Sequence, residues 1–134
     1  AGLLEGDAHV IRNAGGRVTE DAIRSLLISY KMLGTNEWFI IQHLHCGMQK
    51  FTNEEARALF AADAAEQGID AREVHYIDFM PIGGTIEENL VRDVRRLRTH
   101  PLVPASITLH GYIYDVHTGR LIVSEEAERI GAAK

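Results

Sequence analysis

His43 and Cys46 are the two residues whose types and spacing most directly suggest chemistry in this sequence. They form a His-x-x-Cys pattern, which Gly47 follows at once. An imidazole nitrogen and a thiolate are both good zinc ligands, and a bend at the end of a strand can bring residues at this spacing to one metal ion. The pattern also fits a structural interpretation, in which Cys46 packs as a small hydrophobic residue beside a histidine bonded to the backbone.

Other catalytic patterns have less support. Cys46 could act as a nucleophile only with a base from a distant segment. His45 lies between the two candidate ligands and is expected to be a surface residue or to support the ligands from outside. The glycine-rich Asn13–Gly16 lacks both the G-x-G-x-x-G pattern and the Walker lysine of phosphate-binding loops. Its glycines fit a plain turn, or a close approach of the backbone to a neighbouring site.

The elements around this pattern are predicted to be a strand, a helix and a second strand. Residues 8–12 are apolar-rich and run into the glycine turn, which is typical of a strand. Thr19 is a suitable N-cap for the following helix, and Gly34 is a suitable stop. The run Glu37–Gln42 is almost continuously apolar, which favours a strand buried on both faces of a parallel sheet. The candidate ligands would then lie beyond the carboxyl end of a strand, where open α/β sheets form their sites.

The rest of the chain predicts two further helices and a C-terminal hairpin in one domain, residues 1–134. Thr85 and Glu88 make a capping-box pattern at the start of the second of these helices, and Pro101 limits its end. The predicted elements span residues 54–67, 85–98, 107–116 and 121–123.

Composition narrows the class of protein and its partners. The 134 residues include 14 Lys and Arg against 19 Asp and Glu, a net charge of −5 with histidines neutral. Apart from the run Arg92–Arg98, which suits the solvated face of a helix, basic residues are scattered, so no nucleic acid or membrane partner is expected. No run reaches the roughly 18 apolar residues of a membrane span. The single cysteine suits a reducing compartment, so we expect a cytoplasmic protein.

Several motifs along the chain carry a resemblance to a known family: Gly6–Gly15, Asp21–Ser25, His43–Met48, Pro101–Gly111 and Tyr114–Leu121. With them, nearly the whole chain resembles a β-class carbonic anhydrase. The C-terminal part is similar to the compact bacterial and archaeal branch, which includes carbonyl sulfide hydrolases. The resemblance implies a three-layer α/β fold with a mostly parallel sheet, flanking helices and a C-terminal hairpin. It also implies a homodimer or higher homo-oligomer.

The resemblance further implies a zinc enzyme with one zinc ion per subunit. By resemblance, His43 and Cys46 are the second and third protein ligands of zinc. Gly47, His9 and Ala14 match positions that line the substrate pocket. The family reaction is the reversible hydration of carbon dioxide to bicarbonate by hydroxide on zinc, which lowers the pKa of its bound water to about 7.

The sequence departs from the family pattern in one respect. The family's first zinc ligand belongs to a C-x-D-x-R motif whose aspartate and arginine form the catalytic dyad, but this chain has one cysteine and no such motif. We therefore expect the first ligand and the dyad upstream of Ala1, with no dyad residue in residues 1–134. The family's motif also follows the central strand of its sheet. Without that strand, residues 8–12 and 37–42 would flank a gap and expose unpaired edges.

Three functions remain open on the sequence. The first is zinc-dependent hydration of carbon dioxide. The second is hydrolysis of carbonyl sulfide or a related small heterocumulene, which uses parallel chemistry and differs in the shape and polarity of the pocket. The third is a truncated, non-catalytic relative that binds zinc or serves as an oligomer scaffold.

Overall fold

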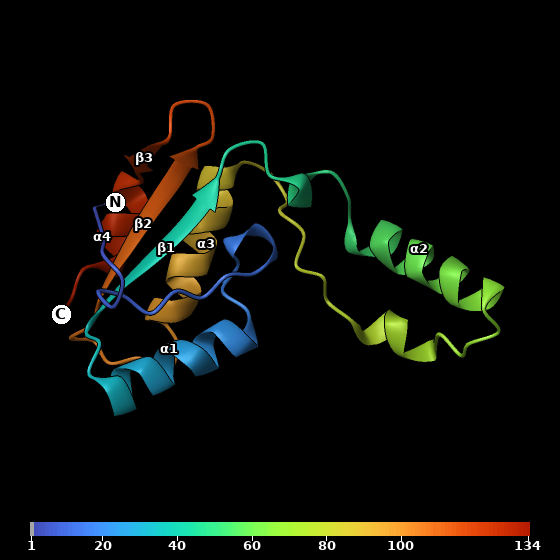
Figure 1. Cartoon of the computed structure of the whole chain (residues 1–134), viewed down its shortest axis with the longest axis horizontal. Coiled ribbons are helices and arrows are strands. Elements are labelled where there is room, and N and C mark those ends of the chain that lie inside the picture. Colours follow the sequence, from blue (N-terminus) through green and yellow to red (C-terminus); the bar gives the residue numbers. More distant parts are fainter. Residues whose placement is uncertain (1) are drawn as a thin grey trace.

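The computed structural model describes residues 2–134 and shows a three-stranded sheet with helices packed against it (Figure 1). The strands are β1 (Glu37–His43), β2 (Thr108–Asp115) and β3 (Arg120–Val123), in the order β1-β2-β3. β1 and β2 are parallel, whereas β2 and β3 form the predicted antiparallel hairpin. The α-helices are α1 (Glu20–Leu33), α2 (Asn53–Glu66), α3 (Ile86–Arg98) and α4 (Glu125–Gly131). Short 3-10 helices are η1 (Ala14–Gly16), η2 (Gly47–Gln49) and η3 (Arg72–Tyr76). The predicted α/β class is confirmed.

Side-chain caps explain where three of the α-helices begin. The Thr19 hydroxyl accepts a hydrogen bond from the Ala22 backbone N–H at 3.2 Å, which caps α1. Thr52 and Thr85 form capping boxes at the starts of α2 and α3. Gly34 ends α1 in the left-handed conformation, with φ of 77°. The Thr19 and Thr85 caps and the Gly34 stop were predicted from the sequence, and these predictions are confirmed.

The core lies between the sheet and the two helices that cover one of its faces, α3 and α4 (Figure 1). Leu90, Val94 and Leu97 of α3 are fully buried, as is Leu109 of β2. A Cβ added at Gly131 of α4 would lie 2.0 Å from the Leu109 carbonyl oxygen, so only glycine permits this close packing. α4 was not predicted, because its seven residues are too few for a helical period to stand out.

Two predictions about strands are wrong. Residues 8–12 are not a strand in the structure, and Val10 is 77% exposed, because no strand among residues 2–134 pairs with them. β1 is not buried on both faces either. Its burial alternates, and Phe39 and Ile41 are 55% and 42% exposed on the face that α3 does not cover. Within the described residues β1 pairs with β2 alone, so its other edge is unpaired.

α2 stands apart from the sheet, together with η3 (Figure 1). Ala56 is its one buried residue, and Phe60 stacks on Phe79 with ring centroids 5.2 Å apart. The helix matches the prediction for residues 54–67 in position. Among residues 2–134, no helix is both long and apolar enough to span a membrane.

One histidine links the two parallel strands to α4 and predicts a pH dependence of stability. His110 of β2 lies 2.8 Å from a carboxylate oxygen of Glu37 and 2.9 Å from one of Glu128. Burial lowers the pKa of His110, but the hydrogen bonds and charges of Glu128 and Glu37 outweigh it and raise the pKa above 6.5. The protonated form therefore stabilises the fold below pH 6.5, and this stabilisation is lost as the pH rises through the folded-state pKa.

Replacing His110 by glutamine should remove that dependence. We expect the free-energy difference between wild type and H110Q to be larger at about pH 5.5 than at about pH 8.5. Urea unfolding at both pH values measures it. A difference that is the same at both pH values, or larger at the higher one, would contradict the ion-pair interpretation.

Candidate metal centre

His43 is the last residue of β1 and presents a nitrogen suited to a metal. The side chain is half-buried, and its Nδ1 lies 2.9 Å from the Leu44 carbonyl oxygen. A carbonyl oxygen only accepts hydrogen bonds, so Nδ1 carries the proton and donates. Nε2 then keeps its lone pair, which is the form of imidazole that binds zinc. The Leu44 carbonyl thereby fixes both the tautomer and the ring orientation.

Cys46 lies one turn further along, at the start of η2. It is 4% exposed and has no disulfide partner. The Leu44 backbone N–H donates to the Tyr114 carbonyl oxygen at 3.0 Å, which holds the bend between the two candidate ligands against β2. His45 within the bend has a left-handed φ of 57°, and its exposed ring meets His117 edge-on at 5.4 Å. His45 is therefore a surface residue.

The donor set fits part of a zinc site. His43 and Cys46 supply a nitrogen and a thiol of the right types, at the position that the sequence predicted. A catalytic zinc site has about three protein ligands and one open position. Within residues 2–134, no three His, Cys, Asp or Glu residues lie close enough together to hold a metal ion. The described residues therefore supply two of the roughly three protein ligands that a catalytic zinc site needs.

The η1 turn contacts both β1 and η2, the two elements that precede and follow the bend between the candidate ligands. A Cβ added at Gly15 would lie 3.1 Å from the Met48 side chain in η2. Ala14 is exposed in this turn. Gly47 is also exposed, and a Cβ added there would meet no heavy atom within 4 Å. The structure therefore places Ala14 and Gly47 on neighbouring short helices, with open space next to Gly47.

His9 lies in a different setting. Its Nδ1 is 2.7 Å from the Ser29 hydroxyl oxygen of α1, and the Ser29 hydroxyl in turn contacts the Thr35 hydroxyl at 2.9 Å. His9 lines a shallow hollow of about 200 Å³ against α1 with Ile28 and Ser29. Neither this hydrogen bond nor this hollow includes His43 or Cys46.

Gly16 allows the close approach of η1 to β1 and gives a stability prediction. Its φ is 61°, and an added Cβ would lie 2.4 Å from the Ile41 carbonyl oxygen. Replacing Gly16 by alanine should therefore lower the free energy of unfolding by at least about 2 kcal/mol. Denaturant unfolding measures this, with Gly47→Ala as the matched control, since alanine meets open space there. Equal stability of the two variants would contradict the close packing.

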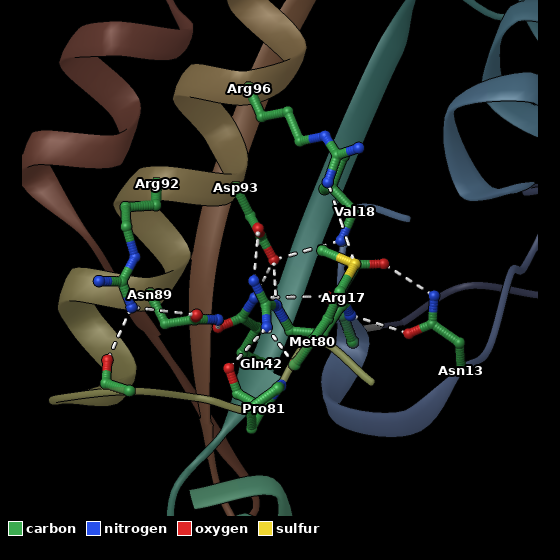
Figure 2. Close-up of polar contacts among 12 residues, drawn as sticks. Asn13, Arg17, Val18, Gln42, Met80, Pro81, Asn89, Arg92, Asp93 and Arg96 are labelled. Carbon is green, nitrogen blue, oxygen red and sulfur yellow. Dashed lines mark hydrogen bonds and ion pairs between the residues drawn. The ribbon is translucent and has the colours of Figure 1, made fainter. Parts of the chain in front are cut away.

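A buried polar network lies next to this turn (Figure 2). Arg17 Nε donates to Asp93 Oδ2 at 2.8 Å, and both side chains are less than a tenth exposed. Gln42 Nε2 donates to the same Asp93 oxygen at 2.8 Å, and Asn89 Nδ2 donates to Gln42 Oε1 at 2.8 Å. Sequence reasoning missed this network because Arg17 and Asp93 are 76 positions apart and match no short motif.

Comparison with known proteins identifies the family. A family model described as "Carbonic anhydrase" matches residues 1–121. Over 120 residues the chain is 38% identical to Beta-carbonic anhydrase 1 of Mycobacterium tuberculosis, with 90% of this chain and 69% of that protein covered. It is 35% identical over 140 residues to carbon disulfide hydrolase of Acidianus sp. (strain A1-3), with 90% and 67% covered. The chain thus spans about two thirds of the length of these relatives.

Solved structures agree with the sequence matches. Carbonic anhydrase from Streptococcus mutans superposes with a TM-score of 0.81 at 45% identity, covering 92% of this chain and 70% of that one. An apo form of carbon disulfide hydrolase superposes with a TM-score of 0.76 at 34% identity, covering 93% and 70%. The chain belongs to the β-carbonic anhydrase family. The chain is therefore a carbonic-anhydrase-type protein by class. Members of this family are generally zinc-dependent.

Proposed function

We propose that this chain is the greater part of a zinc enzyme that reversibly hydrates carbon dioxide to bicarbonate. The observation that carries the proposal is the end of β1, where Nδ1 of His43 donates to the Leu44 carbonyl and leaves Nε2 free, three residues before the buried Cys46. Family membership supports the same reaction. Zinc, when bound, lowers the pKa of a coordinated water to about 7 and so makes a nucleophile available at neutral pH.

The residues of this chain have distinct parts in that proposal. His43 and Cys46 are two of the protein ligands for one zinc ion per subunit. Gly47 and Ala14 line the space for the small substrate, where short side chains leave room for it. His9 belongs to the same pocket by resemblance, although its Nδ1 lies against Ser29 in this structure.

In this proposal the remaining donor comes from outside residues 1–134. This chain has one cysteine, and its described residues hold no group of three metal-binding side chains. We propose that a further segment supplies the first cysteine ligand and the aspartate–arginine dyad. The same proposal includes a cytoplasmic homodimer or higher homo-oligomer, without a nucleic acid or membrane partner.

A second candidate function is hydrolysis of a sulfur-containing heterocumulene such as carbonyl sulfide or carbon disulfide. Relatives named as carbon disulfide hydrolases match this chain about as well as those named as carbonic anhydrases, at 35% and 38% identity. The two reactions share an electrophilic carbon between two double bonds. They differ in the size and polarity of the pocket that admits the substrate.

Turnover of the three substrates by the zinc-loaded full-length protein tests the two functions. Faster hydration of carbon dioxide than hydrolysis of carbonyl sulfide or carbon disulfide supports the first function, and the reverse order supports the second. Absence of all three activities in a protein that carries zinc would overturn both. That outcome would support the third function, a non-catalytic relative that binds zinc or serves as an oligomer scaffold.

A further inference from the structure

We propose, on the basis of the zinc site proposed above, that Gln42 and Arg17 are positioning residues for its ligands. Gln42 directly precedes His43 in β1, so the two side chains lie on opposite faces of the strand. Gln42 is 1% exposed and contacts α3, where its amide bonds both Asp93 and Asn89 at 2.8 Å. The carboxyl end of β1 is thereby fixed to α3 from the face opposite His43.

The same network fixes the η1 turn. The Asn13 side chain forms two hydrogen bonds with the backbone of Arg17. Its Oδ1 accepts from the Arg17 N–H at 2.8 Å, and its Nδ2 donates to the Arg17 carbonyl at 2.7 Å. Arg17 and the backbone N–H of Val18 both donate to Asp93. Gln42 Nε2 also reaches the Gly16 carbonyl at 3.4 Å. Figure 2 shows Arg17, directly after η1, pointing toward Asp93 of α3, with Asn13 bonded to the Arg17 backbone on the other side.

Arg17 is also linked to the segment that carries Cys46, through the loop at residues 80–82. Its Nη1 donates to the carbonyl oxygens of Met80 and Pro81, the second at 3.1 Å. The next residue, Ile82, donates its backbone N–H to the Met48 carbonyl oxygen at 2.8 Å, two positions after Cys46. The Arg17 guanidinium is therefore linked through Asp93 and Gln42 to the strand that ends at His43, and through the loop at residues 80–82 to the segment that follows Cys46.

The chemical consequence follows from burial. Donors and acceptors that are shielded from water have no substitute partners, so a satisfied network holds its elements in one arrangement. Groups that orient metal ligands from outside the coordination shell contribute about 10–100-fold to metal affinity. The side chains of Gln42 and Arg17 form hydrogen bonds with other residues and with neither candidate ligand. Their effect on the metal is therefore transmitted through the backbone of β1, η1 and the loop at residues 80–82.

Cobalt(II) titration of the full-length protein tests this role, because a thiolate–cobalt absorption band reports the Cys46 bond and the ligand-field bands report its geometry. Gln42→Met keeps the side-chain volume and removes three hydrogen bonds. Arg17→Lys keeps the charge but loses the planar guanidinium, which donates to Asp93 and to the loop at residues 80–82 at the same time. We expect each variant to bind cobalt at least about tenfold more weakly than wild type, with shifted ligand-field bands.

Arg98→Met is the matched control for destabilisation alone. Arg98 is half-buried and donates to the Ile107 carbonyl at 2.5 Å, at the start of β2, whereas His43 pairs with Tyr114 at its other end. Its cobalt affinity should stay at the wild-type value, although its unfolding temperature falls. Equal weakening in the Arg98 and Gln42 variants, or an unchanged affinity and spectrum in folded Gln42→Met and Arg17→Lys, would overturn the positioning role. A wild-type spectrum without a thiolate–cobalt band would overturn the ligand assignment itself, and the positioning role with it.

Discussion

Replacing Cys46 by serine is expected to weaken zinc retention by more than about 100-fold, a larger effect than changes outside the coordination shell produce. Cys46 is buried three residues after His43 and has no disulfide partner, so its sulfur is available to a metal. A serine hydroxyl is a poor zinc ligand in comparison, because it does not ionise near neutral pH. Metal analysis after dialysis against a chelator measures the loss, and the activity of the full-length protein should disappear with it.

His45→Asn is the matched control for this substitution. His45 lies between the candidate ligands in sequence, but its ring is exposed and lies against His117. Zinc content and activity should therefore remain at wild-type values. If C46S kept its zinc, or if H45N lost zinc to the same extent, the assignment of Cys46 as a ligand would be wrong.

Replacing Asp93 by alanine is expected to cost the largest amount of stability, about 3–5 kcal/mol, because it leaves the buried Arg17 guanidinium unpaired. Asp93 also accepts from Gln42 and from the Val18 backbone, so those donors lose a partner as well. Urea unfolding of the metal-free protein measures the change. Performing it without metal separates the cost to the fold from any effect on zinc binding.

The exposed pair of Asp21 and Arg24 provides the comparison. Their side chains are 74% and 69% exposed, and the carboxylate and guanidinium lie 2.8 Å apart, as close as in the buried pair. Solvent screens such a pair, so Asp21→Ala should change stability little. Similar unfolding free energies for D93A and D21A would contradict the view that burial makes the Arg17–Asp93 pair important.

Much of the helical structure could be predicted because its signals are local. The caps at Thr19, Thr52 and Thr85 act within about one turn of the backbone, so a short stretch of sequence contains both donor and acceptor. The turn before β3 is also local, since Asp115 accepts from the backbone of His117 at 2.9 Å. The His-x-x-Cys pattern of His43 and Cys46 is local as well, and the zinc site that it indicates stays a prediction.

Features that depend on distant partners were predicted less well. Residues 8–12 have the composition of a strand, but a strand forms only beside a neighbour, and none pairs with them here. The apolar run of β1 was expected to be covered on both faces, yet coverage depends on which elements pack there. Arg98 was assigned to a solvated helix face, whereas it is half-buried and donates to the Ile107 carbonyl.

The Arg17 network lay beyond sequence reasoning for the same physical reason. Its members come from η1, β1 and α3, and the distance between them along the chain carries no period or motif. One available signal was the position of Gln42, a polar residue inside an otherwise apolar strand. A buried polar group needs a partner, so Gln42 implied a polar contact on the adjacent helix.

X-ray absorption at the zinc edge of the purified full-length protein tests the central claim most directly. If His43 and Cys46 are ligands, the first shell contains sulfur at about 2.3 Å together with imidazole nitrogen at about 2.0–2.1 Å, at one zinc per chain. The sulfur signal should decrease in C46S, and the imidazole signal in His43→Ala. A first shell of oxygen and nitrogen without sulfur, or a spectrum unchanged by both substitutions, would contradict the account.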